Sequence, residues 1–408
     1  MRILNISAQK PDSTGSGTYL SALVRSQLAA GCEPAVLCGA APGDTQGDIP
    51  TGVPVYTVDF DTPELPFHIC GMSDVMPYPS TRYRDLTSQM TSSFEDAFCR
   101  SIERAVAKFE PDVLLCHHLY LVCALARELV RDRPVCAVCH STDIRQMRSH
   151  GLERERVLAA VRGLDAVFSL HAEQAQQIVE TYGVDPARVR VVGTGYDHHT
   201  FCPDAAVPRR VDSLVFVGKV CVKKGVASLL EALGLVDRGS HPDLSLTLVG
   251  GHAHDDEFQQ IESAAAASTV PVTIAGRVDG EELVRTYRAS EVFVLPSFFE
   301  GLPLVTIEAL ACGCKVVMTE LPGVRPWMEA ALPGAPVAWV TPPTMVDVDT
   351  PDSRDLPRFE RDLAQAIQDA LDAPAPCFDT SGVSWDACSE RILETVQRLL
   401  VQKGGIDG

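Results

Sequence analysis

Two carboxylates separated by seven residues offer the clearest chemistry in the sequence. Between Glu300 and Glu308, Pro303 favours the first turn of a helix after an apolar strand. Amides at a helix start lack partners within the helix, and the macrodipole adds about half a positive charge there. We therefore expect a phosphate near Leu304 and Val305, with the two carboxylates accepting hydrogen bonds from hydroxyl groups. A diphosphate with a polyol at each end, as in a nucleotide sugar, would use all of these groups.

Two lysines follow another expected strand. Lys219 ends the strand that contains Phe216, and Lys224 stands with Gly225 at the start of the next helix. Both ammonium groups should then reach the carboxyl edge of a parallel sheet, where open α/β sheets bind their ligands. The formal net charge is -19, so two cations at this edge indicate a negative charge that needs a partner.

The glutamate pair has two alternative interpretations. A loop glutamate beside a solvated helix glutamate would bind nothing. In a glycosidase, one carboxyl would act as the acid and the other as the nucleophile. A hydrolase needs no paired lysines, so Lys219 and Lys224 favour binding of a diphosphate over hydrolysis.

A short glycine-rich segment provides a second, weaker phosphate signal. Gly15, Ser16 and Gly17 lie between the first strand and a helix expected from Tyr19. The dinucleotide fingerprint G-x-G-x-x-G is incomplete because its third glycine position holds Leu20. A loop that merely turns the chain remains an alternative.

Length and composition define the class of protein. The 408 residues exceed what one core usually serves, so we expect two domains. The formal net charge of -19 argues against a broad surface that binds nucleic acid, because such a surface needs many Lys and Arg side chains. The sequence contains no apolar run near the roughly 18 residues of a membrane span, and its start lacks the pattern of a secretory signal. The fourteen cysteines lack the spacing of a zinc site, which predicts free thiols and a cytoplasmic location.

Short apolar strands alternate with helical patterns in both halves, which predicts α/β architecture with parallel sheets. The expected strands are 2–6, 35–38, 53–58, 113–116, 135–139, 166–170, 214–217, 245–249, 272–275, 292–295 and 315–318. The expected helices include 19–30, 93–109, 119–131, 172–182, 226–236, 256–267, 281–289, 304–312, 358–371 and 385–401. Two segments, 63–83 and 336–357, are expected as a long loop and a surface excursion.

Segments 216–225 and 300–308, the glycine-rich segment 15–17 and His140 at a strand end together resemble family 4 retaining glycosyltransferases. The resemblance covers nearly the whole chain and implies the GT-B fold, in which two Rossmann-like domains face a central cleft. It implies an acceptor-binding domain at 1–205 and a donor-binding domain at 206–383. The C-terminal helix, 384–403, would cross back to the first domain.

The resemblance also implies roles for individual residues. Lys219 and Lys224 would hold the donor diphosphate, Glu300 the sugar hydroxyls and Glu308 the ribose. His140 would lie beside the anomeric carbon. The other implied donor contacts are Gly15, Ser16, Gly17, Gly218, Arg277, Val278, Gly301, Leu302, Leu304 and Val305.

No cofactor or metal is expected. Lys219 stands where the family usually has arginine, which replaces a bidentate fork by a point charge. The group His252, His254, Asp255 and Asp256 could suggest a metal site. Lysines take the role of the metal in such enzymes, and adjacent aspartates in a loop are usually solvated.

The acceptor side has fewer signals. The candidate acceptor residues are Tyr78, Arg82, His118, Asp143 and Arg145, which would suit a polar and even anionic acceptor. A packed loop with exposed charges is the equal alternative. The acceptor can be soluble or lipid-linked, so peripheral membrane contact stays open, as does the oligomeric state.

The resemblance thus implies a metal-independent, retaining hexosyltransferase that uses a nucleoside-diphosphate sugar, with UDP as the expected nucleotide. Two alternatives remain. One is a GT-B sugar-phosphate synthase or nucleotide-sugar epimerase, which would share the nucleotide-binding half. The other is a nucleotide-sugar-binding subunit without turnover.

Overall fold

The computed structural model describes residues 1–404 except 75, 253, 301, 322, 348–349 and 375–377. The chain forms two compact units. The first contains Met1–Gly195 and Trp385–Gly408, and the second contains Tyr196–Ser384. The division therefore precedes residue 205, where the sequence placed it, and the chain returns to the first unit at Trp385.

The first unit is built on a seven-stranded parallel sheet with the order β3-β2-β1-β6-β7-β8-β9. Its strands are β1 (Arg2–Ile6), β2 (Glu33–Ala40), β3 (Val55–Asp59), β6 (Val113–His117), β7 (Val135–Val138), β8 (Ala166–Ser169) and β9 (Val189–Val191). Its helices are α1 (Gly15–Ala29), α2 (Ser88–Phe109), α3 (Leu121–Leu129), α4 (Thr142–Ser149), α5 (Arg154–Arg162), α6 (Ala172–Tyr182) and α13 (Trp385–Gly404). A two-stranded parallel pair, β4 (Cys70–Gly71) and β5 (Thr81–Arg82), lies outside this sheet.

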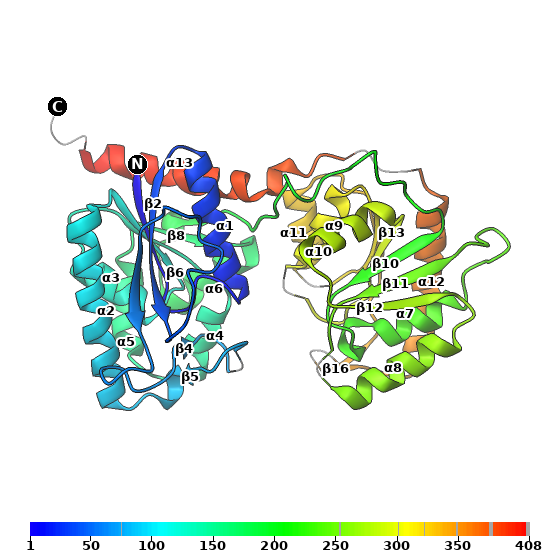
Figure 1. Cartoon of the computed structure of the whole chain (residues 1–408), viewed down its shortest axis with the longest axis horizontal. Coiled ribbons are helices and arrows are strands. Elements are labelled where there is room, and N and C mark those ends of the chain that lie inside the picture. The colour runs from blue at the N-terminus through cyan, green and yellow to red at the C-terminus, as the bar shows by residue number, and fades with distance from the viewer. Residues whose placement is uncertain are drawn as a thin grey trace. The chain divides into compact units, whose positions relative to one another are not determined.

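Alternating side chains give this sheet two buried faces, as a parallel sheet requires. Ile3, Val113 and Leu115 belong to a core with residues of α1 and α13. Leu4 and Leu114, their neighbours in sequence, belong to the opposite core with residues of α2, α3 and α5. Helix α13, red in Figure 1, thus completes the core of the first unit.

The second unit has a six-stranded sheet, again parallel, with the order β12-β11-β10-β13-β14-β15. Its strands are β10 (Ser213–Val217), β11 (Ser245–Val249), β12 (Val272–Gly276), β13 (Val292–Leu295), β14 (Lys315–Thr319) and β15 (Val337–Val340). Its helices are α7 (Val226–Leu233), α8 (Asp255–Ala267), α9 (Gly280–Ala289), α10 (Leu304–Ala311), α11 (Val324–Ala331) and α12 (Leu356–Asp372). A small hairpin joins β16 (Met345–Asp347) to β17 (Thr350–Pro351).

Both sheets reverse their strand order once, between β1 and β6 and between β10 and β13. This arrangement is Rossmann-like, and such a switch point opens a crevice at the carboxyl ends of the two strands. The candidate residues of each unit follow these strand ends. The expected pair of Rossmann-like domains is therefore confirmed.

Several local expectations differ from the structure. The segment 336–357 contains β15 and the small hairpin, so the surface-excursion interpretation was wrong. The segment 63–83 is an irregular loop around β4 and β5, and its buried side chains include Phe67, Ile69 and Tyr83. This loop is packed into the first core, as the packed-loop alternative required.

Candidate functional site

The second unit brings Lys224 and Glu300 together at its switch point. Lys224 ends a short 3₁₀ turn after β10, and its Nζ lies 2.7 Å from Oε1 of Glu300 in the loop after β13. Ser297 Oγ donates to the same carboxylate oxygen over 2.6 Å. Gly225 makes this approach possible, because a Cβ there would lie 2.0 Å from the carbonyl oxygen of Pro296. The first expected carboxylate is thus partly buried and fixed by two donors.

Lys219 remains exposed at the end of β10, with no ion pair to any described residue. Gly218 precedes it with a φ of 156°. A Cβ at Gly250 would lie only 1.8 Å from the carbonyl oxygen of Gly218. The two glycines therefore allow the ends of β10 and β11 to lie close together. Lys219 follows Gly218 directly and precedes Lys224 by five residues.

The start of α10 offers fewer free amides than the sequence suggested. The amide of Leu304 donates to the carbonyl of Leu302, and that of Thr306 donates to Pro303. Val305 is the remaining first-turn amide, and it forms no turn hydrogen bond with the described residues. The side chains of Leu302, Leu304 and Val305 pack against the core. A phosphate at this helix start would thus meet chiefly the Val305 amide.

Glu308, the second carboxylate, is held by a buried tyrosine. The hydroxyl of Tyr287 on α9 donates to Oε2 of Glu308 over 3.3 Å. Burial raises the pKa of Glu308 to about 7, although the Tyr287 hydrogen bond opposes this shift. Glu308 therefore titrates near neutral pH and changes there from a donor and acceptor to a pure acceptor of hydrogen bonds.

The remaining expected donor contacts lie near the end of β12. Arg277 is exposed, and its aliphatic part and Nε pass close to Gly251. Val278 packs against the core. Gly301, the residue after the first carboxylate, lies outside the described residues.

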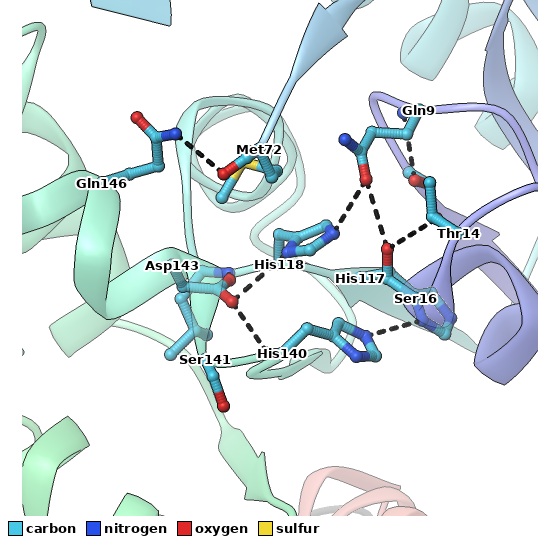
Figure 2. A network of polar contacts seen from close by, with 12 residues as sticks. Gln9, Thr14, Ser16, Met72, His117, His118, His140, Ser141, Asp143 and Gln146 are labelled. Carbon is cyan, nitrogen blue, oxygen red and sulfur yellow. Dashed lines mark hydrogen bonds and ion pairs between the residues drawn. The ribbon is translucent and has the colours of Figure 1, made fainter. Parts of the chain in front are cut away.

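In the first unit, a network of polar side chains gathers at the ends of β1, β6 and β7 (Figure 2). His118 follows β6 with a φ of 82°, a rare backbone conformation for a residue other than glycine. Its Nε2 lies 3.2 Å from Gln9 Oε1, and its Nδ1 lies 3.3 Å from Asp143 Oδ2. Gln9 Oε1 also accepts from Ser16 at the start of α1. The network thus connects three separate segments of the chain.

Asp143 organises this network from within. Its side chain is completely buried, and it accepts from the amides of Leu119 and His140 as well as contacting His118. Burial opposes ionisation, yet His118 and the His140 amide together hold the pKa of Asp143 below its usual value. Asp143 was expected to touch an acceptor. Its position instead makes it a residue that positions the neighbouring histidines.

His140 lies at the carboxyl end of β7, where the sequence placed it. Its Nε2 is 3.4 Å from Nδ1 of His117, and the ring of Tyr19 meets it edge-on with centroids 5.0 Å apart. Burial and the two neighbouring imidazoles lower the pKa of His140 well below its usual value. Burial likewise lowers the pKa of His117 to about 3. Both rings are therefore neutral at pH 7.

The glycine-rich segment forms the first turn of α1 rather than a loop before it. Thr14 caps the helix, because its side chain accepts from the amide of Gly17 over 3.0 Å. A Cβ at Gly17 would lie 2.4 Å from the backbone oxygen of Asp12, whereas one at Gly15 would meet nothing within 4 Å. Gly17 is thus explained by close backbone packing alone.

The other expected acceptor residues lie in or contact the 63–83 loop. Arg145 on α4 pairs with Asp74 over 3.4 Å, and Arg82 pairs with Asp85 over 2.6 Å. Tyr78 is half-buried, and Lys10 lies over its ring, 4.9 Å from the centroid. These cations lie around the packed 63–83 loop.

Sequence reasoning missed several residues of both sites. They are Gln9 and His117 in the first unit and Tyr287 and Ser297 in the second. Ser297 directly follows the Leu-Pro end of an apolar strand, so its place at the switch point was available from the pattern. Tyr287 lies within an amphipathic helix and gave no such signal.

Within each unit taken alone, the described His, Cys, Asp and Glu side chains form no three-membered group close enough to hold an ion. His252 stacks on Phe258 and contacts Asp255 over 3.2 Å.

The described cysteines are free. Among the described ranges, no helix has the length and apolar character that a bilayer span requires.

Comparison with known proteins assigns each unit to a described sequence family. Residues 13–200 match the model named Glycosyltransferase Family 4, and residues 211–347 match Glycosyl transferases group 1. Among curated relatives, the D-inositol 3-phosphate glycosyltransferase of Mycobacteroides abscessus is 28% identical over 360 residues, or 79% of this chain and 74% of that protein. The protein of the same name from Pseudarthrobacter chlorophenolicus is 33% identical, but over only 40% of this chain and 41% of its own length.

Solved structures agree on the fold. Sucrose-phosphate synthase from Thermosynechococcus elongatus aligns with a TM-score of 0.60 at 18% identity, covering 98% of this chain and 100% of that one. Anabaena HepE in complex with UDP aligns with a TM-score of 0.62 at 14% identity, with the same two coverages. These structures share the GT-B fold with this chain. The two family models, which match residues 13–200 and 211–347, and the curated relatives place the chain in the family 4 glycosyltransferases.

Proposed function

We propose that this glycosyltransferase moves a sugar from a UDP-sugar to a hydroxyl group of its acceptor with retention of anomeric configuration. The observation that carries the proposal is the Lys224–Glu300 pair at the switch point of the second sheet, with Ser297 on the same carboxylate. A cation and a hydroxyl-accepting carboxylate at one place fit the diphosphate and the sugar of one donor. The UDP complexes of HepE support uridine as the nucleoside.

In this proposal the second unit holds the donor. Lys219 and Lys224 would neutralise the diphosphate as its bond to the anomeric carbon breaks. Glu300 would accept hydrogen bonds from the sugar, and Glu308 from the ribose. The acceptor oxygen would form its bond to the anomeric carbon on the face that the diphosphate leaves, and its proton would pass to the departing phosphate oxygen. Glu300 is therefore a binding group and not a covalent nucleophile.

The first unit would serve the acceptor. His140 keeps the role that the family resemblance implies, beside the anomeric carbon, and as a neutral imidazole it would act by hydrogen bonding. Asp143 and His118 would set its orientation. Relatives named D-inositol 3-phosphate glycosyltransferase support a phosphorylated cyclitol as the acceptor class. Arg145 and Lys10 would meet such an anion on this unit, where it would compete with their carboxylate partners Asp74 and Asp44.

We further propose that the reaction needs no metal ion or other cofactor. Two lysines near the diphosphate would supply the positive charge that a divalent cation supplies elsewhere. Lys219 has no carboxylate partner among the described residues and is therefore available to the ligand.

A panel of nucleotide sugars tests the proposal. We expect a UDP-sugar to raise the melting temperature of the protein, and inositol phosphate to make UDP release from that donor several-fold faster. UDP release that is independent of any acceptor would indicate hydrolysis or epimerisation instead. If no nucleotide sugar shifts the melting temperature or is turned over, the assignment of the donor site is wrong.

A further inference from the structure

A basic groove lies on the first unit, away from every residue assigned to donor or acceptor. It has a volume of about 400 Å³ and runs between the edge of the sheet and the last turns of α13. Ala166, Ala187 and Leu399 contribute small or apolar surface to its lining. A cavity of this size accommodates a small ligand rather than a single ion.

Cations dominate the lining of this groove. Arg188 and Arg190 come from the edge strand and the turn before it, and Arg398 and Lys403 come from α13. Asp165 is the one acid among the lining residues. Four cations around a single carboxylate contrast with the formal net charge of -19 for the whole chain.

Asp165 is already engaged and cannot neutralise the arginines. Its Oδ1 lies 2.9 Å from Nζ of Lys403, and its Oδ2 lies 3.3 Å from Nη1 of Arg127 and accepts from the Val135 amide over 2.9 Å. The Asp165 carboxylate therefore has little capacity left to pair with Arg188, Arg190 or Arg398. The positive charge of the groove is left to a ligand or to solvent.

Arg188 and Arg190 are the cations of the groove that lack a carboxylate partner among the described residues. Each guanidinium donates one hydrogen bond to a backbone carbonyl. Arg188 donates to Leu164 over 2.9 Å, and Arg190 donates to Val189 over 3.0 Å. Arg188 ends the turn before β9 and Arg190 lies within β9, and both line the same groove. Arg398 donates to the carbonyl of Glu394 over 3.2 Å, and its ion contact with the exposed Glu394 carboxylate is long, at 3.6 Å.

We propose that this groove binds a phosphate-bearing ligand at a second site, distinct from the donor site. Guanidinium groups match phosphate oxygens in bidentate hydrogen bonds, and three of them line one small cavity. The phosphate can belong to a soluble molecule or to a lipid headgroup, since both present the same oxygens. Exposed Val191 and Val401 flank the basic residues in sequence, which justifies testing a lipid source.

Calorimetry with inorganic pyrophosphate tests the soluble source. Pyrophosphate should also enter the donor site, so the double variant Lys219→Ala/Lys224→Ala is used to weaken binding there. Two double variants change the groove, namely Arg188→Gln/Arg190→Gln and Arg190→Gln/Arg398→Gln. All three are compared with the full-length wild-type protein. The last variant leaves the Arg188–Leu164 contact intact in case its loss affects folding. Arg104→Gln, an exposed arginine on α2, is the matched control. We expect one binding event to survive the lysine changes and to weaken about tenfold in both arginine pairs.

Co-sedimentation with phosphatidylcholine vesicles, with and without phosphatidylglycerol, tests the lipid source. Binding that needs phosphatidylglycerol and falls in both arginine pairs would place the phosphate on a lipid. The proposal is overturned if the arginine pairs change neither measurement, or if Arg104→Gln weakens binding as much as they do. Loss of pyrophosphate binding in the lysine variant alone, without vesicle binding, would also overturn it while leaving the donor assignment intact.

Discussion

The Nζ of Lys224 lies 2.7 Å from Oε1 of Glu300, so the two groups that we propose to contact different parts of the donor form an ion pair with each other. The side chain of Glu300 is 11% exposed and that of Lys224 is 27% exposed, so solvent screens this pair only in part. A donor would replace the contact, with its diphosphate next to the ammonium and a sugar hydroxyl on the carboxylate. The ion pair holds both side chains at the end of the sheet where the proposed donor would bind.

Replacing Lys224 by alanine should lower kcat/KM by about 100- to 1,000-fold, because it removes charge stabilisation of the leaving diphosphate. The melting temperature should fall little, since the position is partly exposed and no core contact is lost. Lys223→Ala, at the adjacent exposed lysine, is the control and should retain activity. Equal activity of Lys224→Ala and the control would contradict the assigned role.

Nucleotide affinity should depend on pH through Glu308. Its pKa of about 7 in the free protein means that the carboxylate form grows as pH rises from about 6 to 8, and that form accepts both ribose hydroxyls. UDP should therefore bind more tightly with rising pH in calorimetry, by up to about tenfold per unit below the pKa. Tyr287→Phe removes the hydrogen bond that opposes the shift, so the rise should move to higher pH.

Glu308→Gln is the matched control for this pH dependence, since glutamine does not titrate. It should bind UDP with a pH profile that reflects only the nucleotide's own ionisation. Identical profiles for the wild type and Glu308→Gln would show that Glu308 does not contact the ribose.

Asp143→Asn should destabilise the first unit by about 2 kcal/mol, because an amide nitrogen cannot accept from the buried amides of Leu119 and His140. Chemical unfolding measures the change. Asp74→Asn removes an exposed carboxylate that pairs with Arg145, and it should cost about 1 kcal/mol or less. A loss for Asp143→Asn no larger than for Asp74→Asn would mean that Asp143 does not organise the network.

Chelation tests the absence of a metal requirement. Transfer activity assayed with EDTA should stay within about twofold of the activity with added magnesium, because lysines supply the charge that metals supply in other enzymes. A large loss with EDTA that magnesium or manganese restores would contradict metal independence.

Much of the fold was predictable because strongly apolar strands alternate with amphipathic helices. The elements missed have weak patterns for identifiable reasons. Helix α4 buries Asp143 and Gln146 where the helical period calls for apolar residues, and β9 spans only Val189–Val191. Helix α11 contains Pro326 in its first turn, where proline is tolerated but reads as a break.

The candidate sites were predictable only where a residue lies next to a recognisable strand end or helix start. That rule selected Lys224, Glu300 and His140 as candidates, and each of them follows a strand of the structure. It could not find Gln9 or Tyr287, which reach the sites through contacts between segments far apart in sequence. Sequence alone also does not reveal that the Asp143 carboxylate faces two buried amides.

The anomeric configuration of the product tests the central claim most directly. The protein is incubated with a UDP-sugar of known α configuration and the acceptor, and proton NMR follows the anomeric signal of the first product formed. We predict an α-linked product accompanied by an equal amount of UDP, with both absent when Glu300→Ala replaces the wild type. A β-linked product, or full activity of Glu300→Ala, would contradict the account.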